Sequence, residues 1–75
     1  MVLLHIGLTY LAITREPTWQ GSRDAIEGAG YSPADSVAFR QHLAGGNYLA
    51  SLTGSDEITL STIGQRLIEQ FQREP

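Results

Sequence analysis

The first apolar run of the chain, residues 2–14, fits two different periodicities. Helical spacing separates Leu4, Leu8 and Leu11, while apolar or aromatic residues also alternate at every second position from 4 to 12. Thirteen residues is long for a strand, so the length favours a helix. A helix that is apolar on all sides is expected to be largely buried. It should end before Pro17, because the residue preceding a proline is disfavoured in helical geometry.

A short extended piece at residues 18–19 is predicted to lead into a second helix. Ser22 is a suitable N-cap for that helix, because its hydroxyl can accept a hydrogen bond from a free backbone N–H of the first turn. Gly28 and Gly30 are typical of a helix end.

The clearest helix start in the sequence predicts a third helix. Ser32 provides a capping hydroxyl, Pro33 suits the first helical position, and Asp35 faces the positive end of the helix dipole. The helix should continue to about Ala44, and the glycine pair at 45–46 should end it. Its apolar spacing predicts that Phe39 and Leu43 point into the core.

The pattern then becomes typical of β structure. Two short β-prone runs, "NYLASLT" and "EITL", are separated by the turn-like "GSD", which predicts a β-hairpin. Ser61 follows as the expected cap of a last helix, whose apolar stripe contains Ile63, Leu67 and Phe71. The predicted fold class is mainly α with a small β-hairpin, in the order helix, short strand, helix, helix, hairpin, helix.

Composition limits the chain to one small domain over residues 1–75. Its 75 residues include 41% hydrophobic positions, enough for a core, and no cysteine for a disulfide or a thiolate metal site. Eight acidic residues outnumber five arginines, and the net charge of −3 argues against binding nucleic acid by bulk charge alone. The apolar N-terminus lacks the basic start and cleavage site of a signal peptide, so we expect a soluble, cytoplasmic protein.

Two stretches, "HLAGGNYLASL" and "ITLSTIGQRLIEQF", carry a resemblance to a known family. They resemble a winged helix-turn-helix domain of the MarR-like or PadR-like kind, in which a leucine ends the third helix, a glycine turn follows, and a wing hairpin leads into the next helix. The matching positions are Leu43, Gly46, Leu60, Ser61 and Gly64. The resemblance implies that the third helix enters the major groove of DNA and that the wing contacts its backbone.

The DNA-contacting residues implied by this resemblance lie on the third helix, the preceding helix and the wing. A glutamine side chain can hydrogen-bond to adenine and an arginine side chain to guanine. The third helix therefore carries residue types that can recognise DNA bases. The small residues at the hairpin tip would let a phosphate approach closely. The candidate set is Arg40, Gln41, His42, Arg23 and Ser55.

The acidic residues support an alternative function. The stretch from residue 20 to residue 53 contains two arginines and three acidic residues. Asp56 and Glu57 add two more acidic residues on the predicted wing. A DNA-binding surface normally concentrates cations. The alternative is an acidic protein-interaction module that binds a basic or nucleic-acid-binding protein, like a small phage-type inhibitor or adaptor. Under either function, a homodimer through the terminal helices is an open possibility.

Enzymatic and cofactor-dependent functions find little support. Two histidines separated by 37 positions, without cysteine, form no metal-ligand pattern, and the glycines at 28–30 lack the rest of a dinucleotide-binding fingerprint. No combination of nucleophile, base and orienting group is evident. We therefore expect no cofactor, no metal and no catalysis.

Overall fold

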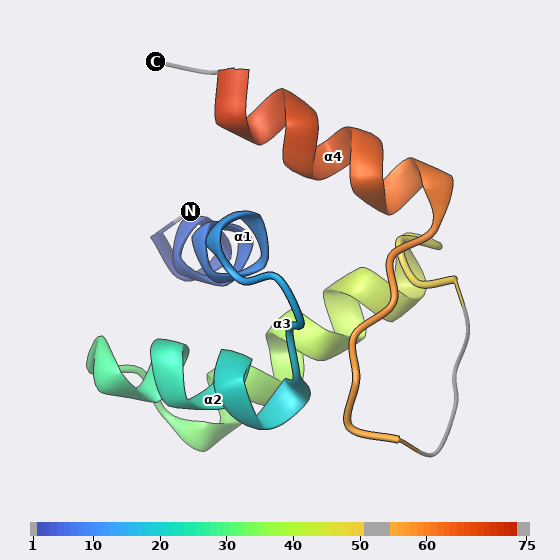
Figure 1. Cartoon of the computed structure of the whole chain (residues 1–75). Coiled ribbons are helices and arrows are strands. Elements are labelled where there is room, and N and C mark those ends of the chain that lie inside the picture. Colours follow the sequence, from blue (N-terminus) through green and yellow to red (C-terminus); the bar gives the residue numbers. More distant parts are fainter. Residues whose placement is uncertain (1, 51–54, 74–75) are drawn as a thin grey trace.

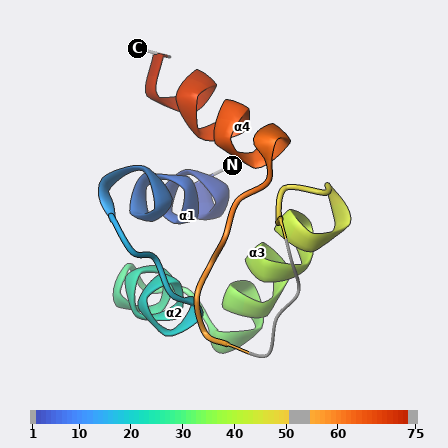
Figure 2. The same ribbon diagram turned by 45° about the vertical axis from the view of Figure 1, so that its right-hand side comes forward.

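The computed structural model describes residues 2–50 and 55–73, which form four helices (Figure 1). Their bounds are α1 (Val2–Ile13), α2 (Trp19–Gly28), α3 (Pro33–Gly45) and α4 (Thr62–Arg73). In both ribbon views α1 lies between α2 and α4, and α3 crosses beside α2 (Figures 1 and 2). None of the helices in this part of the chain is both long and apolar enough to span a bilayer.

The ambiguous N-terminal segment is a helix, as its length favoured. α1 packs against each of the other three helices and buries Leu8 and Leu11. Gly7 allows α1 to approach α3 closely, because a Cβ atom at this position would collide with the ring of Phe39. α1 is therefore the central element of the core.

α2 begins earlier than predicted. Thr18 is its N-cap, and its hydroxyl accepts a hydrogen bond from the Gly21 N–H at 2.9 Å. The predicted extended piece at 18–19 is thus wrong for Trp19, which is the first helical residue, and the predicted cap at Ser22 is wrong too. Ser22 is buried inside the helix and donates to the Trp19 carbonyl at 2.9 Å. The early start turns Trp19 into the core, where its large apolar surface is buried.

α3 has the predicted start and end. Ser32 and Asp35 form a reciprocal capping box: the Asp35 N–H donates to the Ser32 hydroxyl at 3.3 Å, and the Ser32 N–H donates to the Asp35 carboxylate at 3.0 Å. The helix ends at Gly45 with Gly46 as its C-cap. Phe39 and Leu43 are fully buried, as predicted.

The predicted β-hairpin is wrong, and with it the winged helix-turn-helix fold class. No strand or hairpin forms among the described residues; two isolated antiparallel bridges join Thr18 to Glu57 and Leu49 to Leu60. Segment 56–61 follows the core packing of Ile58, whose side chain is buried and whose N–H donates to the Pro17 carbonyl at 2.9 Å. On its other side, Ser61 and Ala50 donate to the carbonyls of Tyr48 and Thr59 at 2.9 and 2.8 Å, and among the described residues this pairing is limited to one bridge. Part of the expected hairpin, residues 51–54, lies outside the described residues.

α4 begins after the predicted cap. The Ser61 hydroxyl accepts a hydrogen bond from the Gly64 N–H at 3.1 Å and donates to the Asn47 carbonyl at 2.7 Å, which ties the helix start to the end of α3. Ile68 is buried against the core, and His5 of α1 meets Phe71 edge to face at 5.0 Å between ring centroids. The buried cluster comprises Leu8, Leu11, Trp19, Ile26, Phe39, Leu43, Ile58 and Ile68.

Candidate nucleic-acid interface

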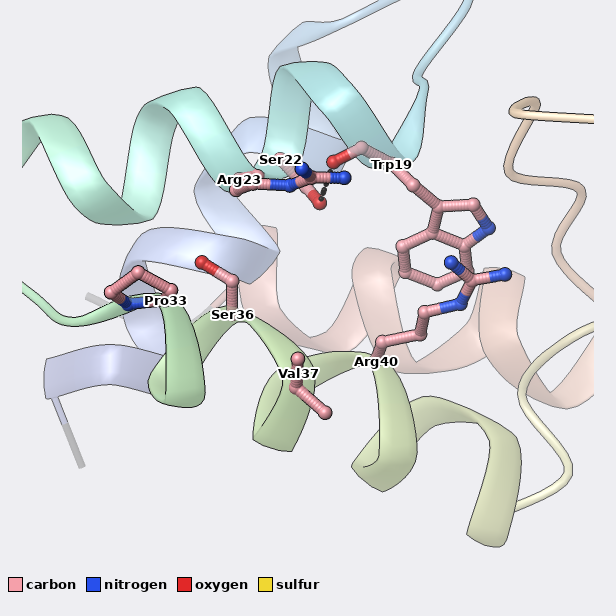
Figure 3. Close-up of a pocket in the computed structure, with 7 residues that line it drawn as sticks. All are labelled: Trp19, Ser22, Arg23, Pro33, Ser36, Val37 and Arg40. Carbon is pink, nitrogen blue, oxygen red and sulfur yellow. Dashed lines mark hydrogen bonds between the residues drawn. The ribbon is translucent and has the colours of Figure 1, made fainter.

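A surface pocket lies between α2 and α3 and brings two of the predicted site residues together (Figure 3). It measures about 260 Å³, and Arg23 of α2 and Arg40 of α3 both line it. The two arginines are 17 positions apart in the sequence, and the short turn between the helices places them on one face. The remaining lining residues are Trp19, Ser22, Pro33, Ser36 and Val37.

Trp19 orients one of the two guanidinium groups. The Cζ atom of Arg40 lies 4.6 Å from the centroid of the indole ring, and its guanidinium is drawn over this ring in the close-up (Figure 3). A guanidinium stacked on an indole is held by the ring quadrupole while its N–H donors remain directed to solvent. Arg40 is therefore oriented before any ligand arrives.

None of the described residues that line this pocket is acidic. The carboxylates of α2 and α3 accept hydrogen bonds from nearby side chains. Asp24 accepts from the Gln20 amide at 2.9 Å, Glu27 accepts from the Ser36 hydroxyl at 3.4 Å, and Asp35 is held in the capping box. The two arginines are therefore the charged residues of the pocket lining, and the Glu27 carboxylate borders it through its hydrogen bond with Ser36.

The predicted readers on α3 separate onto different faces. Gln41 is exposed on the side opposite Phe39 and Leu43, next to the arginine pocket. His42 faces α1 instead: with Leu3, Leu4, Ala38 and Phe39 it lines an apolar hollow, and its ring lies 6.1 Å from that of Tyr48. The structure therefore joins Arg23 and Arg40 in one pocket, leaves Gln41 exposed on the outer side of α3, and places His42 toward α1.

Ser55 lies in the segment that meets the start of α2, and it does not line the arginine pocket. It is exposed, and its hydroxyl accepts a hydrogen bond from the Glu57 N–H at 3.2 Å. The following residue, Asp56, accepts from the Trp19 N–H through its carbonyl at 2.9 Å and from the Gln20 N–H through its carboxylate at 3.2 Å. Asp56 thus stabilises the positive end of the α2 dipole, a role that sequence analysis did not identify.

The exposed face of α3 contains Gln41, which the sequence singled out, and a set of small apolar residues to which it assigned no role. Residues at three- and four-residue spacing form this face, and all but one are small and apolar. We call it the α3 outer face; it consists of Ala34, Val37, Ala38, Gln41 and Ala44. The signal was present in the sequence, because apolar residues occur all around this helix while only the side with Phe39 and Leu43 is needed for the core.

The described residues contain no group of three or more His, Cys, Asp or Glu side chains that could hold a metal ion. Comparison of the chain with protein-family models, with curated proteins and with solved structures found no match.

Proposed function

We propose that this chain is a non-enzymatic DNA-binding regulator that contacts duplex DNA through α2 and α3. The observation that carries the proposal is the pairing of Arg23 and Arg40 in one pocket without an acidic lining residue. Two guanidinium groups on adjacent helices, one of them oriented by Trp19, suit the closely spaced phosphates of a DNA strand. The outer face of α3 lies beside them and provides the surface that would enter the major groove.

The division of roles follows from the geometry. Arg40 is held by Trp19 and Arg23 lies across the pocket, so both would contact phosphates and set the orientation of the protein. Gln41 is exposed beside them and would contact a base edge, preferentially adenine. Because His42 faces α1, it has no contact with DNA in this proposal.

Two arginines give a small cationic surface, and a dimer would double it. In both ribbon views α4 lies on the other side of α1 from α2 (Figures 1 and 2). A homodimer formed through the terminal helices would leave the α2–α3 face free.

The test of this proposal is a selection from a pool of random duplex sequences, followed by titration of the enriched duplex at low and moderate salt. A DNA-binding regulator enriches a motif and loses affinity steeply as salt increases, because bound arginines release counterions from the phosphates. Absence of binding at low salt would exclude the proposal.

A second candidate function, an acidic protein-interaction module, is favoured by a different observation. The net charge is −3, and an exposed helix face of small apolar residues also suits close packing against a helix of a basic protein. If no duplex binds, a pull-down with the chain as bait, compared with a Val37→Asp variant, tests this candidate. Loss of a captured basic protein in the variant would support it.

A further inference from the structure

The α3 outer face has a composition that suits one kind of DNA sequence. Val37 is the largest exposed apolar side chain on it, at 55% relative exposure, and Ala34, Ala38 and Ala44 surround it. Gln41 is the only residue of this face with hydrogen-bonding capacity in its side chain. In the major groove, the apolar feature available for contact is the thymine methyl group, and a glutamine amide pairs with adenine.

We propose that the α3 outer face reads thymine methyl groups, with Val37 as the principal contact and Gln41 selecting adenine. The inference rests on the proposed function and names its substrate class: duplex DNA containing adjacent A·T pairs. Charge complementarity favours DNA over other occupants, because Arg40 borders this face and shares the α2–α3 pocket with Val37. Small side chains also let the helix backbone approach the floor of the groove.

The contrast with His42 supports this assignment of faces. His42 follows Gln41 directly, yet it lies in the apolar hollow on the α1 side of the helix, together with Ala38 at the edge of the outer face. A reader at position 42 is therefore turned away from a groove centred on Val37. The specificity of the chain would come from one narrow stripe of α3.

Replacing thymine by uracil in the bound duplex tests the inference directly, because uracil lacks only the C5 methyl group. The duplex is the motif enriched by selection, prepared with thymine or with uracil at every thymine position. We expect the wild-type chain to lose about fourfold in affinity for each contacted methyl group that is removed. A Val37→Ser variant should bind the two duplexes equally, since its side chain offers no matching apolar surface.

The matched control is Ile63→Ser, which removes an apolar side chain of similar exposure, 54%, from α4. This variant should keep the thymine preference of the wild-type chain. Far-ultraviolet circular dichroism checks that both variants remain helical.

The outcomes separate the inference from the proposed function. Equal binding of the thymine and uracil duplexes by the wild-type chain would overturn methyl reading and leave DNA binding intact. A thymine preference that survives in Val37→Ser would overturn the assignment to this face. No binding to either duplex at low salt would remove the proposed function, and the inference with it.

Discussion

Arg40 of α3 stacks on Trp19 of α2, with 4.6 Å between the guanidinium carbon and the centroid of the indole ring. The contact joins a residue in the middle of α3 to the first residue of α2, 21 positions earlier in the chain. Trp19 is buried, so its ring is a fixed platform, whereas Arg40 is exposed on top of it. The contact therefore restricts the orientation of the Arg40 side chain while its positive charge stays at the surface.

Substitutions at position 40 should distinguish orientation from charge. Arg40→Lys keeps the positive charge but loses the planar group that stacks on the indole and binds phosphate with two donors. We therefore expect DNA affinity in the order wild type, Arg40→Lys, Arg40→Ala, with Arg40→Ala about tenfold weaker than wild type, corresponding to about 1.4 kcal/mol. Fluorescence anisotropy with a labelled duplex measures the series. Equal affinity of all three chains would show that position 40 takes no part in binding.

Trp19 is the only tryptophan of the chain, so its fluorescence reports on the pocket. DNA that engages Arg40 should alter the environment of the indole and change its emission intensity or wavelength. In Arg40→Ala the response should be strongly reduced at matched occupancy, because the group linking ligand to ring is gone. An unchanged response in this variant would indicate that DNA binds away from the pocket.

Two glycines at helix positions should respond oppositely to alanine. A Cβ atom at Gly64 would collide with the backbone carbonyl of Tyr48, which cannot move without breaking its hydrogen bond from Ser61. Gly64→Ala should lower the free energy of unfolding by about 1–3 kcal/mol.

The control is Gly45→Ala, because a Cβ atom at Gly45 meets open space. That change should leave stability unchanged or raise it by up to about 1 kcal/mol. Urea denaturation followed by circular dichroism measures both variants. Equal effects of the two substitutions would contradict the close packing of the α4 start against Tyr48.

The capping box should contribute measurably to stability. Ser32→Ala removes the acceptor of the Asp35 N–H and should lower the free energy of unfolding by about 1 kcal/mol. Thr62→Ala changes an exposed residue in the first turn of α4 and should shift stability by no more than about 0.5 kcal/mol. Thermal melts of the two variants beside the wild-type chain make the comparison. A Ser32→Ala chain as stable as wild type would contradict a stabilising cap.

The sequence predicted the helices well where local chemistry decides them. Ser32, Pro33 and Asp35 fix the start of α3 through contacts within one turn, and Ser61 fixes the start of α4 in the same way. The start of α2 was predicted at Ser22 although Thr18 provides a local cap, and a distant partner supports the earlier start. Asp56 caps the N-terminus of α2 from 36 positions away, and the burial of Trp19 favours the earlier start.

The predicted hairpin failed for a tertiary reason as well. The β-prone residues 57–60 were expected to pair only with the preceding run. Instead, Ile58 turns its side chain into the core and its backbone toward Pro17, so the segment is shared between two neighbours. A segment rich in β-prone residues favours extended backbone. Which segment it pairs with depends on the parts of the fold that lie on either side of it.

The candidate site was predictable in its residue types and not in its grouping. The resemblance led to Arg23 and Arg40, which line one pocket, and to Gln41, which is exposed on the outer face of α3. His42 was grouped with them because it follows in sequence, but two steps of about 100° from Arg40 bring its side chain to the α1 side of the helix. The Trp19 platform left no signal, because no sequence spacing indicates a contact between two helices.

The most direct test of DNA binding through α2 and α3 is the salt dependence of affinity in two matched double variants. Arg23→Ala/Arg40→Ala empties the pocket of cations, whereas Arg66→Ala/Arg73→Ala removes the same charge from exposed positions of α4. Affinity for the selected duplex is measured from about 50 mM to about 200 mM salt. We expect the pocket variant to bind weakly, with a log–log salt slope smaller by about 1.8, while the α4 variant keeps the wild-type slope. Equal losses in the two variants, or no binding by the wild-type chain, would contradict a DNA interface at α2 and α3.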